Sequence, residues 1–99
     1  MILATHVKQP QEVKDYDIDY APWLLPVNDT LDQIDLDITC LTDSGDDSLI
    51  CTDSSITDTT CKLWLSGGTD GQRYKITVWA HTVGGRIDES ELVFKVKDY

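Results

Sequence analysis

Alternation of apolar and polar residues is the feature that most limits how this chain of 99 residues can fold. In the segment VKDYDIDY, residues 13–20, the apolar or aromatic residues Tyr16, Ile18 and Tyr20 alternate with three aspartates, at positions 15, 17 and 19. A period of two is typical of a β-strand with one face buried and one face in water. No window of a dozen residues carries an apolar stripe with helical spacing. The sequence therefore predicts an all-β chain.

Six or seven short strands are expected, with turn signals between them. They cover residues 13–20, 31–41, 49–52, 60–66, 72–82 and 88–97, and a brief edge strand is expected at 55–57. Pro22 and Pro26 cannot continue a ladder of strand hydrogen bonds, so residues 21–30 are expected to cross between two sheets. This pattern predicts an immunoglobulin-like antiparallel β-sandwich, and a small barrel is the alternative.

Residues 13–99 are expected to form the sandwich as one domain, because a chain of this size cannot divide its core between two folding units. Residues 1–12 show no alternation and are interrupted by Pro10, so they are expected to form an extended arm or a frayed terminus. An arm could contact a neighbouring molecule. Its candidate contact residues are Met1, Ile2, Leu3 and His6.

The formal net charge of -10 argues against a nucleic-acid partner and against anionic membranes. Of the 18 acidic residues, 13 lie in residues 1–58, together with only 2 of the 8 bases. A basic or polar protein surface is the expected partner, and plain solubility is the alternative explanation of the charge. No apolar run is long enough for a transmembrane helix or a secretory signal, so synthesis in the cytoplasm is expected.

Three cysteines, Cys40, Cys51 and Cys61, have neither zinc-site spacing nor an even number for complete pairing. Reduced thiols are expected. Cys40 and Cys61 continue the apolar faces of their strands, so they are interpreted as small core residues. A Cys40–Cys61 crosslink between facing sheets is the alternative.

The glycine-rich stretch LSGGTDGQRYKI, residues 65–76, does not have the spacing of a phosphate-binding loop, and a strand follows it instead of a helix. Tyr74 stands near the start of that strand, where sandwiches often place a tyrosine whose hydroxyl bonds to backbone. Asp70 and Gly71 are expected to form the preceding turn. Gly84 and Gly85 are expected to form a tight hairpin turn in which both take positive φ.

The tryptophans are the candidate contact residues of the folded domain. Trp64 and Trp79 occupy outward positions of their strands, and aromatic residues are enriched where protein interfaces have hot spots. The alternative is that either ring covers a sheet edge or packs under a loop. Trp23 lies between two prolines at the sheet crossing and is expected to close one end of the core.

No set of residues predicts catalysis, because His6 and His81 have no sequence partner that defines a nucleophile and a base. An enzyme is not expected, and no cofactor is indicated. Carboxylates at Asp43–Asp47 suggest a calcium loop, but their spacing does not match the helix–loop–helix pattern. Solvated turn residues are the preferred interpretation.

The chain resembles a known family, the small immunoglobulin-like virion proteins of tailed bacteriophages described as fiber–tail adaptor proteins. The resemblance is carried by VKQPQEVKDYDIDYAPWL with NDTL behind it, and by SSITDTTCKLWLSGGTDGQRYKITVWAHTVGGRIDESELVFKV. It implies an all-β fold, a place in the virion at or near the tail, and no catalytic residues. The chain departs from the family pattern at its three cysteines, where apolar residues are more usual, and in the acidic stretch LTDSGDDSLIC.

Together with this resemblance, the sequence predicts a non-enzymatic structural protein of a phage particle, present in several copies, that joins tail and fibre or bridges neighbouring subunits. Its contacts are expected through edge strands, the outward tryptophans and the amino-terminal arm. One alternative is a capsid decoration or cement protein. A second alternative, of another class, is a carbohydrate- or calcium-binding module.

Overall fold

The computed structural model describes residues 2–99, with side chains from residue 4 onward, and its regular secondary structure consists almost entirely of strands. The seven strands are β1 (Ile2–Lys8), β2 (Lys14–Asp19), β3 (Leu31–Cys40), β4 (Leu49–Ile56), β5 (Thr60–Gly67), β6 (Arg73–Thr82) and β7 (Ile87–Val96). A short helix α1 (Ala21–Leu24) and a 3-10 turn η1 (Leu25–Val27) lie between β2 and β3. The all-β prediction is confirmed.

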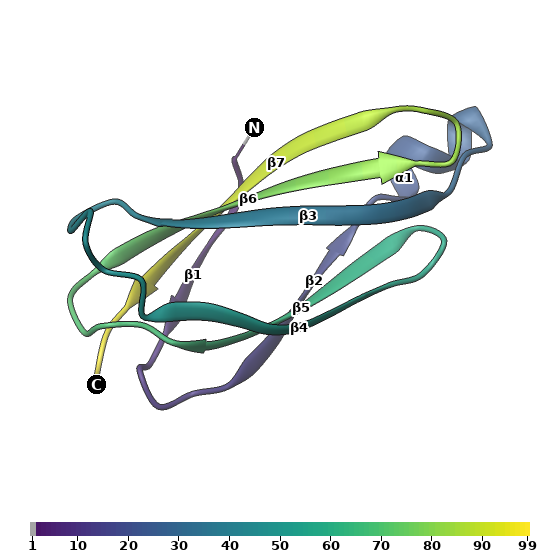
Figure 1. Ribbon diagram of the computed structural model, residues 1–99. Helices are drawn as coiled ribbons and strands as arrows, with labels where there is room; N and C mark the ends of the chain where they lie inside the picture. Colours follow the sequence, from purple (N-terminus) through teal and green to yellow (C-terminus); the bar gives the residue numbers. More distant parts are fainter. Residues whose placement is uncertain (1) are drawn as a thin grey trace.

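The strands form two sheets that pack face to face (Figure 1). The four-stranded sheet has the order β1-β7-β6-β3, and the three-stranded sheet has the order β2-β5-β4. All neighbouring strands are antiparallel except β1 and β7, which are parallel. The chain crosses from one sheet to the other through α1 and η1, as was predicted from Pro22 and Pro26. The β-sandwich prediction is therefore confirmed.

The core lies between the sheets, and the alternation seen in the sequence creates it. Along β6, Ile76, Val78 and Ala80 are fully buried, and the residues between them face outward. Removing a large apolar side chain from water contributes about 1.5–3 kcal/mol, so such strands hold the sheets together. Trp23 is half-buried against this core at the crossing, with its ring 6.2 Å from that of Tyr20.

The amino-terminal segment differs from the sequence expectation. Residues 2–8, expected to belong to an arm, form β1 at the edge of the four-stranded sheet, where they pair with β7. The side chains of β1 do alternate, with Ala4, His6 and Lys8 more buried than Thr5 and Val7. The pattern was missed because a histidine and a lysine occupy inward positions. Met1 lies outside the described residues, and the side chains of Ile2 and Leu3 are not described.

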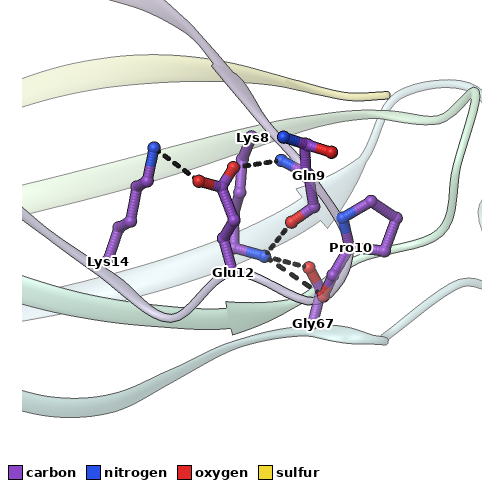
Figure 2. Close-up of polar contacts among 6 residues, drawn as sticks. All are labelled: Lys8, Gln9, Pro10, Glu12, Lys14 and Gly67. Atoms are coloured by element: carbon purple, nitrogen blue, oxygen red, sulfur yellow. Dashed lines mark hydrogen bonds and ion pairs between the residues drawn. The ribbon is translucent and has the colours of Figure 1, made fainter. Parts of the chain in front are cut away.

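Lys8 anchors the end of β1 (Figure 2). Its side chain is fully buried, and Nζ donates hydrogen bonds to the carbonyl oxygens of Gly67 at 2.6 Å and Gln9 at 2.9 Å. Burial lowers the pKa of this ammonium group, and nearby Glu12 opposes that effect. Glu12 also accepts a hydrogen bond from the Gln9 backbone and contacts Lys14 at 2.7 Å. These contacts connect the β1–β2 turn to the end of β5.

Tyr74 lies at the start of β6 and is fully buried. Its hydroxyl accepts a hydrogen bond from the Thr69 backbone N–H at 2.8 Å and lies 3.1 Å from the Ser48 hydroxyl. Asp70 accepts a hydrogen bond from the backbone N–H of Asp98 at 2.9 Å, and Gly71 has a φ of 86°. The glycine-rich stretch is thus a turn whose backbone is held by a hydrogen bond to the Tyr74 hydroxyl.

The turn between β6 and β7 differs in detail from the expected hairpin. Its four connecting residues are 83–86, and only Gly85 has positive φ, at 86°. Gly84 is required for another reason, because a Cβ there would lie 2.6 Å from the Asp29 carboxylate. That carboxylate accepts the Gly84 N–H at 2.9 Å and contacts Arg86 at 2.9 Å.

The remaining differences concern β4 and the cysteines. The two short strands expected at 49–52 and 55–57 are one strand, β4, with an irregularity between Cys51 and Asp53. All three cysteines are free: Cys40 and Cys61 are buried and Cys51 is half-buried. Burial raises the pKa of Cys61 to about 11, so this thiol is protonated at neutral pH.

Candidate interaction surfaces

Trp79 lies on the outer face of the four-stranded sheet, between two carboxylates. It stands on β6 directly opposite Asp35 of β3 on one side and Glu89 of β7 on the other. Its indole Nε1 donates a hydrogen bond to the Glu89 carboxylate at 2.6 Å. This bond fixes the direction of the ring and leaves Asp35 to flank the opposite side. The ring is therefore held in place before any partner arrives.

Two ion-pair contacts lie on the same outer face of this sheet. His81 Nε2 lies 3.0 Å from the carboxylate of Asp35, whose side chain is 62% exposed. Lys75 lies 3.9 Å from Glu91 on β7. Two carboxylates flank Trp79, and two more flank Thr77, which is two positions earlier on β6. These four carboxylates are on Asp35, Asp37, Glu89 and Glu91.

Trp64 also has an acid on each side, on the outer face of the three-stranded sheet. It stands on the central strand β5, opposite Asp15 of β2 and Asp53 of β4. Its side chain is 37% exposed. Lys62 lies 3.2 Å from Asp15, and this contact lowers the pKa of the Asp15 carboxyl. The second outer face therefore also presents an aromatic ring between acids.

Each sheet thus carries a row of acid, tryptophan and acid running across its strands, called here an acid–tryptophan row. One row is Asp35–Trp79–Glu89, and the other is Asp15–Trp64–Asp53. A tryptophan face attracts arginine and lysine through its quadrupole, and flanking carboxylates add charge-assisted hydrogen bonds. The arrangement is suited to receiving a cationic side chain from a partner.

His6 lies elsewhere, at the edge where the two sheets meet. Its ring is stacked on Phe94 with centroids 5.1 Å apart and lies 4.8 Å from the ring of Tyr16. Burial lowers its pKa, which favours the neutral ring. His6 lines a cavity of about 270 Å³ whose floor includes Ala4 and Leu92. It packs between the sheets and does not join either acid–tryptophan row.

The acidic loop at residues 43–47 uses its carboxylates locally. Asp43 accepts the Gly45 N–H at 3.0 Å, and Asp46 accepts hydrogen bonds from both the hydroxyl and the N–H of Ser48. The Ser48 contacts hold the pKa of Asp46 well below its usual value. Among residues 2–99, no three His, Cys, Asp or Glu side chains are placed to hold a metal ion together. Nor does the described part of the chain contain a helix with the length and apolarity to cross a membrane.

Sequence reasoning found both tryptophans but missed the acids beside them. Asp35 and Asp15 are more than 40 residues from Trp79 and Trp64 along the chain, and even Glu89 and Asp53 lie on the next or preceding strand. Only the pairing register brings them together, and no local pattern encodes that register. Aspartate at alternate positions of neighbouring strands is the one signal that pointed to them.

The fold and these surfaces define a small β-sandwich that carries a similar recognition element on each of its two outer faces. Residues 8–95 match the family model described as podophage GP4 fiber-tail adaptor protein gp77. The match covers most of the chain, so the chain belongs to this family of structural phage proteins, and the resemblance seen in the sequence is confirmed. A comparison with curated protein sequences found no match.

Proposed function

We propose that this protein is an adaptor that bridges two neighbouring proteins of a phage particle, one on each face of the sandwich. The observation that carries the proposal is the pair of acid–tryptophan rows, because they lie on opposite outer faces and offer similar chemistry. A domain with one such face could bind to a single surface, whereas a domain with two such faces can connect two neighbouring proteins. The family description supports placement between tail and fibre over the capsid lattice, which was the alternative considered from the sequence.

Each row is proposed to bind an arginine or lysine of a neighbouring virion protein. The cation would lie over the tryptophan ring, with carboxylates on both sides. Desolvated contacts of this kind contribute about 2 kcal/mol, and truncating an aromatic hot spot commonly costs at least as much. The net charge of -10 favours basic surfaces in general, and the rows define where the specific contact is made.

Strand addition is the second contact mode that the fold offers, and β2 is the edge strand best suited to it. The pairing of β2 with β5 runs without irregularity, whereas the pairings of the other three edge strands each contain a register shift. Bulges protect sheet edges from added strands. Aspartates at 15, 17 and 19 would repel the same strand of a second copy, so a basic strand of another protein fits this edge.

The test is the incorporation of variants into particles, measured as copies per purified particle by quantitative mass spectrometry. Trp79→Ser and Trp64→Ser are each expected to reduce incorporation, because losing about 2 kcal/mol weakens association about thirtyfold. Val83→Ser is the matched control, since Val83 is apolar, 70% exposed and lies in a turn. It is expected to incorporate normally.

Melting temperatures of the purified variants must accompany this measurement, so that loss of binding is separated from loss of folding. Variants that fold normally and still incorporate like the parent chain at both tryptophans would overturn the proposal. Loss at only one tryptophan would overturn bridging through both faces and leave a domain attached on one side.

A further inference from the structure

Besides the buried Lys8, three bases in the described part of the chain have no carboxylate at ion-pair distance, although acids outnumber bases by 18 to 8. Lys8 is buried against backbone carbonyls. Four other bases lie between 2.7 and 3.9 Å from a carboxylate oxygen: Lys14, Lys62, Lys75 and Arg86. Within residues 2–99, no carboxylate lies at ion-pair distance from Arg73, Lys95 or Lys97.

These three bases surround one cavity at the end of the sandwich where β6 begins and β7 ends. The cavity has a volume of about 390 Å³. Its lining consists of Asp70, Gly71, Gln72, Arg73, Lys95, Val96 and Lys97. All three side chains are exposed. The basic residues were not seen as a cluster in the sequence because more than 20 positions separate Arg73 from the two lysines.

The position of these bases lowers the stability of the sheet, although the fold does not require bases there. Arg73 and Lys95 stand directly opposite each other on β6 and β7, and like charges in that position destabilise a sheet. The one carboxylate in the lining, Asp70, accepts the backbone N–H of Asp98. Lys97 lies 5.2 Å from the ring of Tyr99, an exposed cation–π contact that leaves its charge uncompensated.

We propose that this basic cavity binds an acidic segment of a neighbouring protein chain. A guanidinium and two ammonium groups around a recess match two or three carboxylates of a short peptide, and the arginine can bind one of them through two hydrogen bonds. The strongly acidic remainder of the surface repels a long polyanion, which favours a short acidic segment over nucleic acid. The adaptor would thereby have a third binding site, which prefers acidic groups, whereas the two acid–tryptophan rows prefer basic groups. This inference rests on the proposed function only for the source of the segment.

The test is a titration of the purified chain with a hexaglutamate peptide, followed by the amide resonances in NMR spectra. Shifts are expected at residues 71–73 and 95–97, and they should weaken as salt rises from about 0.02 to 0.5 M because exposed charges are screened. In the double variant Arg73→Ala/Lys95→Ala, the affinity is expected to fall about tenfold.

Lys14→Ala/Lys62→Ala is the matched control, because it removes the same charge from bases that already have carboxylate partners. It is expected to keep the affinity of the parent chain. Equal weakening in both double variants would show that net charge alone matters and would overturn the site. Shifts centred away from the cavity would also overturn it.

Two further probes identify the ligand class. A single-stranded DNA of six nucleotides that binds more tightly than the peptide would overturn the acidic-segment proposal in favour of nucleic acid. Inorganic phosphate that binds as tightly as the peptide would overturn it in favour of a simple anion site. The titration uses the isolated chain, so its failure is distinguishable from the failure of the tryptophan variants in particles.

Discussion

At the scale of single residues, burial decides which polar groups are structural and which remain available for binding. Lys8 has fully lost contact with water and compensates through backbone carbonyls, whereas Arg73 remains exposed without a carboxylate partner among the described residues. Both are bases in the same acidic chain. Their different surroundings explain why one holds the turn after β1 and the other lines an open cavity.

Lys8→Met is expected to lower the free energy of unfolding by about 1–3 kcal/mol, because the carbonyls of Gly67 and Gln9 lose their buried donor. Urea unfolding of the purified chain measures this. Lys14→Met is the control, since Lys14 is exposed and makes only a surface ion pair with Glu12. A loss below 0.5 kcal/mol, within the range of about ±0.5 kcal/mol expected at exposed sites, would show that the buried ammonium adds little.

Gly84→Ala tests a close approach, whereas most glycines here serve backbone conformation. The added methyl group would displace the Asp29 carboxylate, whose hydrogen bonds hold its pKa down at about 2. A loss of about 1–3 kcal/mol is expected from thermal unfolding, because the Gly84 N–H and Arg86 lose a buried acceptor. An unchanged melting temperature would contradict this role of Gly84.

At the scale of elements, β1 makes the stability of the sandwich depend on pH. His6 of β1 packs between Tyr16 and Phe94, and burial lowers its pKa below the ordinary value of 6.5. The unfolded chain therefore takes up a proton from about pH 6.5 downward, before the folded chain does. The free energy of unfolding should fall as the pH decreases from about 7.5 to 5.5.

His6→Phe is expected to flatten this dependence because phenylalanine keeps the ring packing and cannot be protonated. His81→Gln, which changes the other histidine on an outer face, should leave the fall in place. Chemical unfolding at each pH measures the effect. If the free energy of unfolding falls by the same amount in the His6→Phe chain, the pH dependence arises from another group.

The strands that sequence reasoning located well are those whose alternation is complete. β6 and β7 bury aliphatic or aromatic residues at successive inward positions, so their extent was predicted within a few residues. β1 was missed because His6 and Lys8 occupy inward positions, and their burial depends on partners from β5, β7 and the following turn. Those partners are fixed by tertiary structure, which a local pattern cannot contain.

The functional surfaces follow the same rule. Trp64 and Trp79 could be identified as outward from the period of two alone. The acids that flank them and the cluster of Arg73, Lys95 and Lys97 depend on which residues of separate strands are paired with each other. The pairing of the strands therefore determines which candidate residues lie side by side and form a site.

At the scale of the whole molecule, the protein is an elongated sandwich of about 43 × 22 × 18 Å with chemically distinct surfaces. Two outer faces present tryptophan between acids, and one end presents bases around a recess. Such a distribution lets a small domain contact several neighbours through chemically different surfaces. Membership in a fiber-tail adaptor family is consistent with that use.

The proposal that both outer faces bind neighbouring proteins is tested most directly by a reconstruction of the phage particle that places this domain among its neighbours. We predict that both outer faces are covered by other proteins, with an arginine or lysine within about 6 Å of each of the Trp64 and Trp79 rings. A particle in which either face is open to solvent, or in which acidic side chains meet both tryptophans, would contradict it.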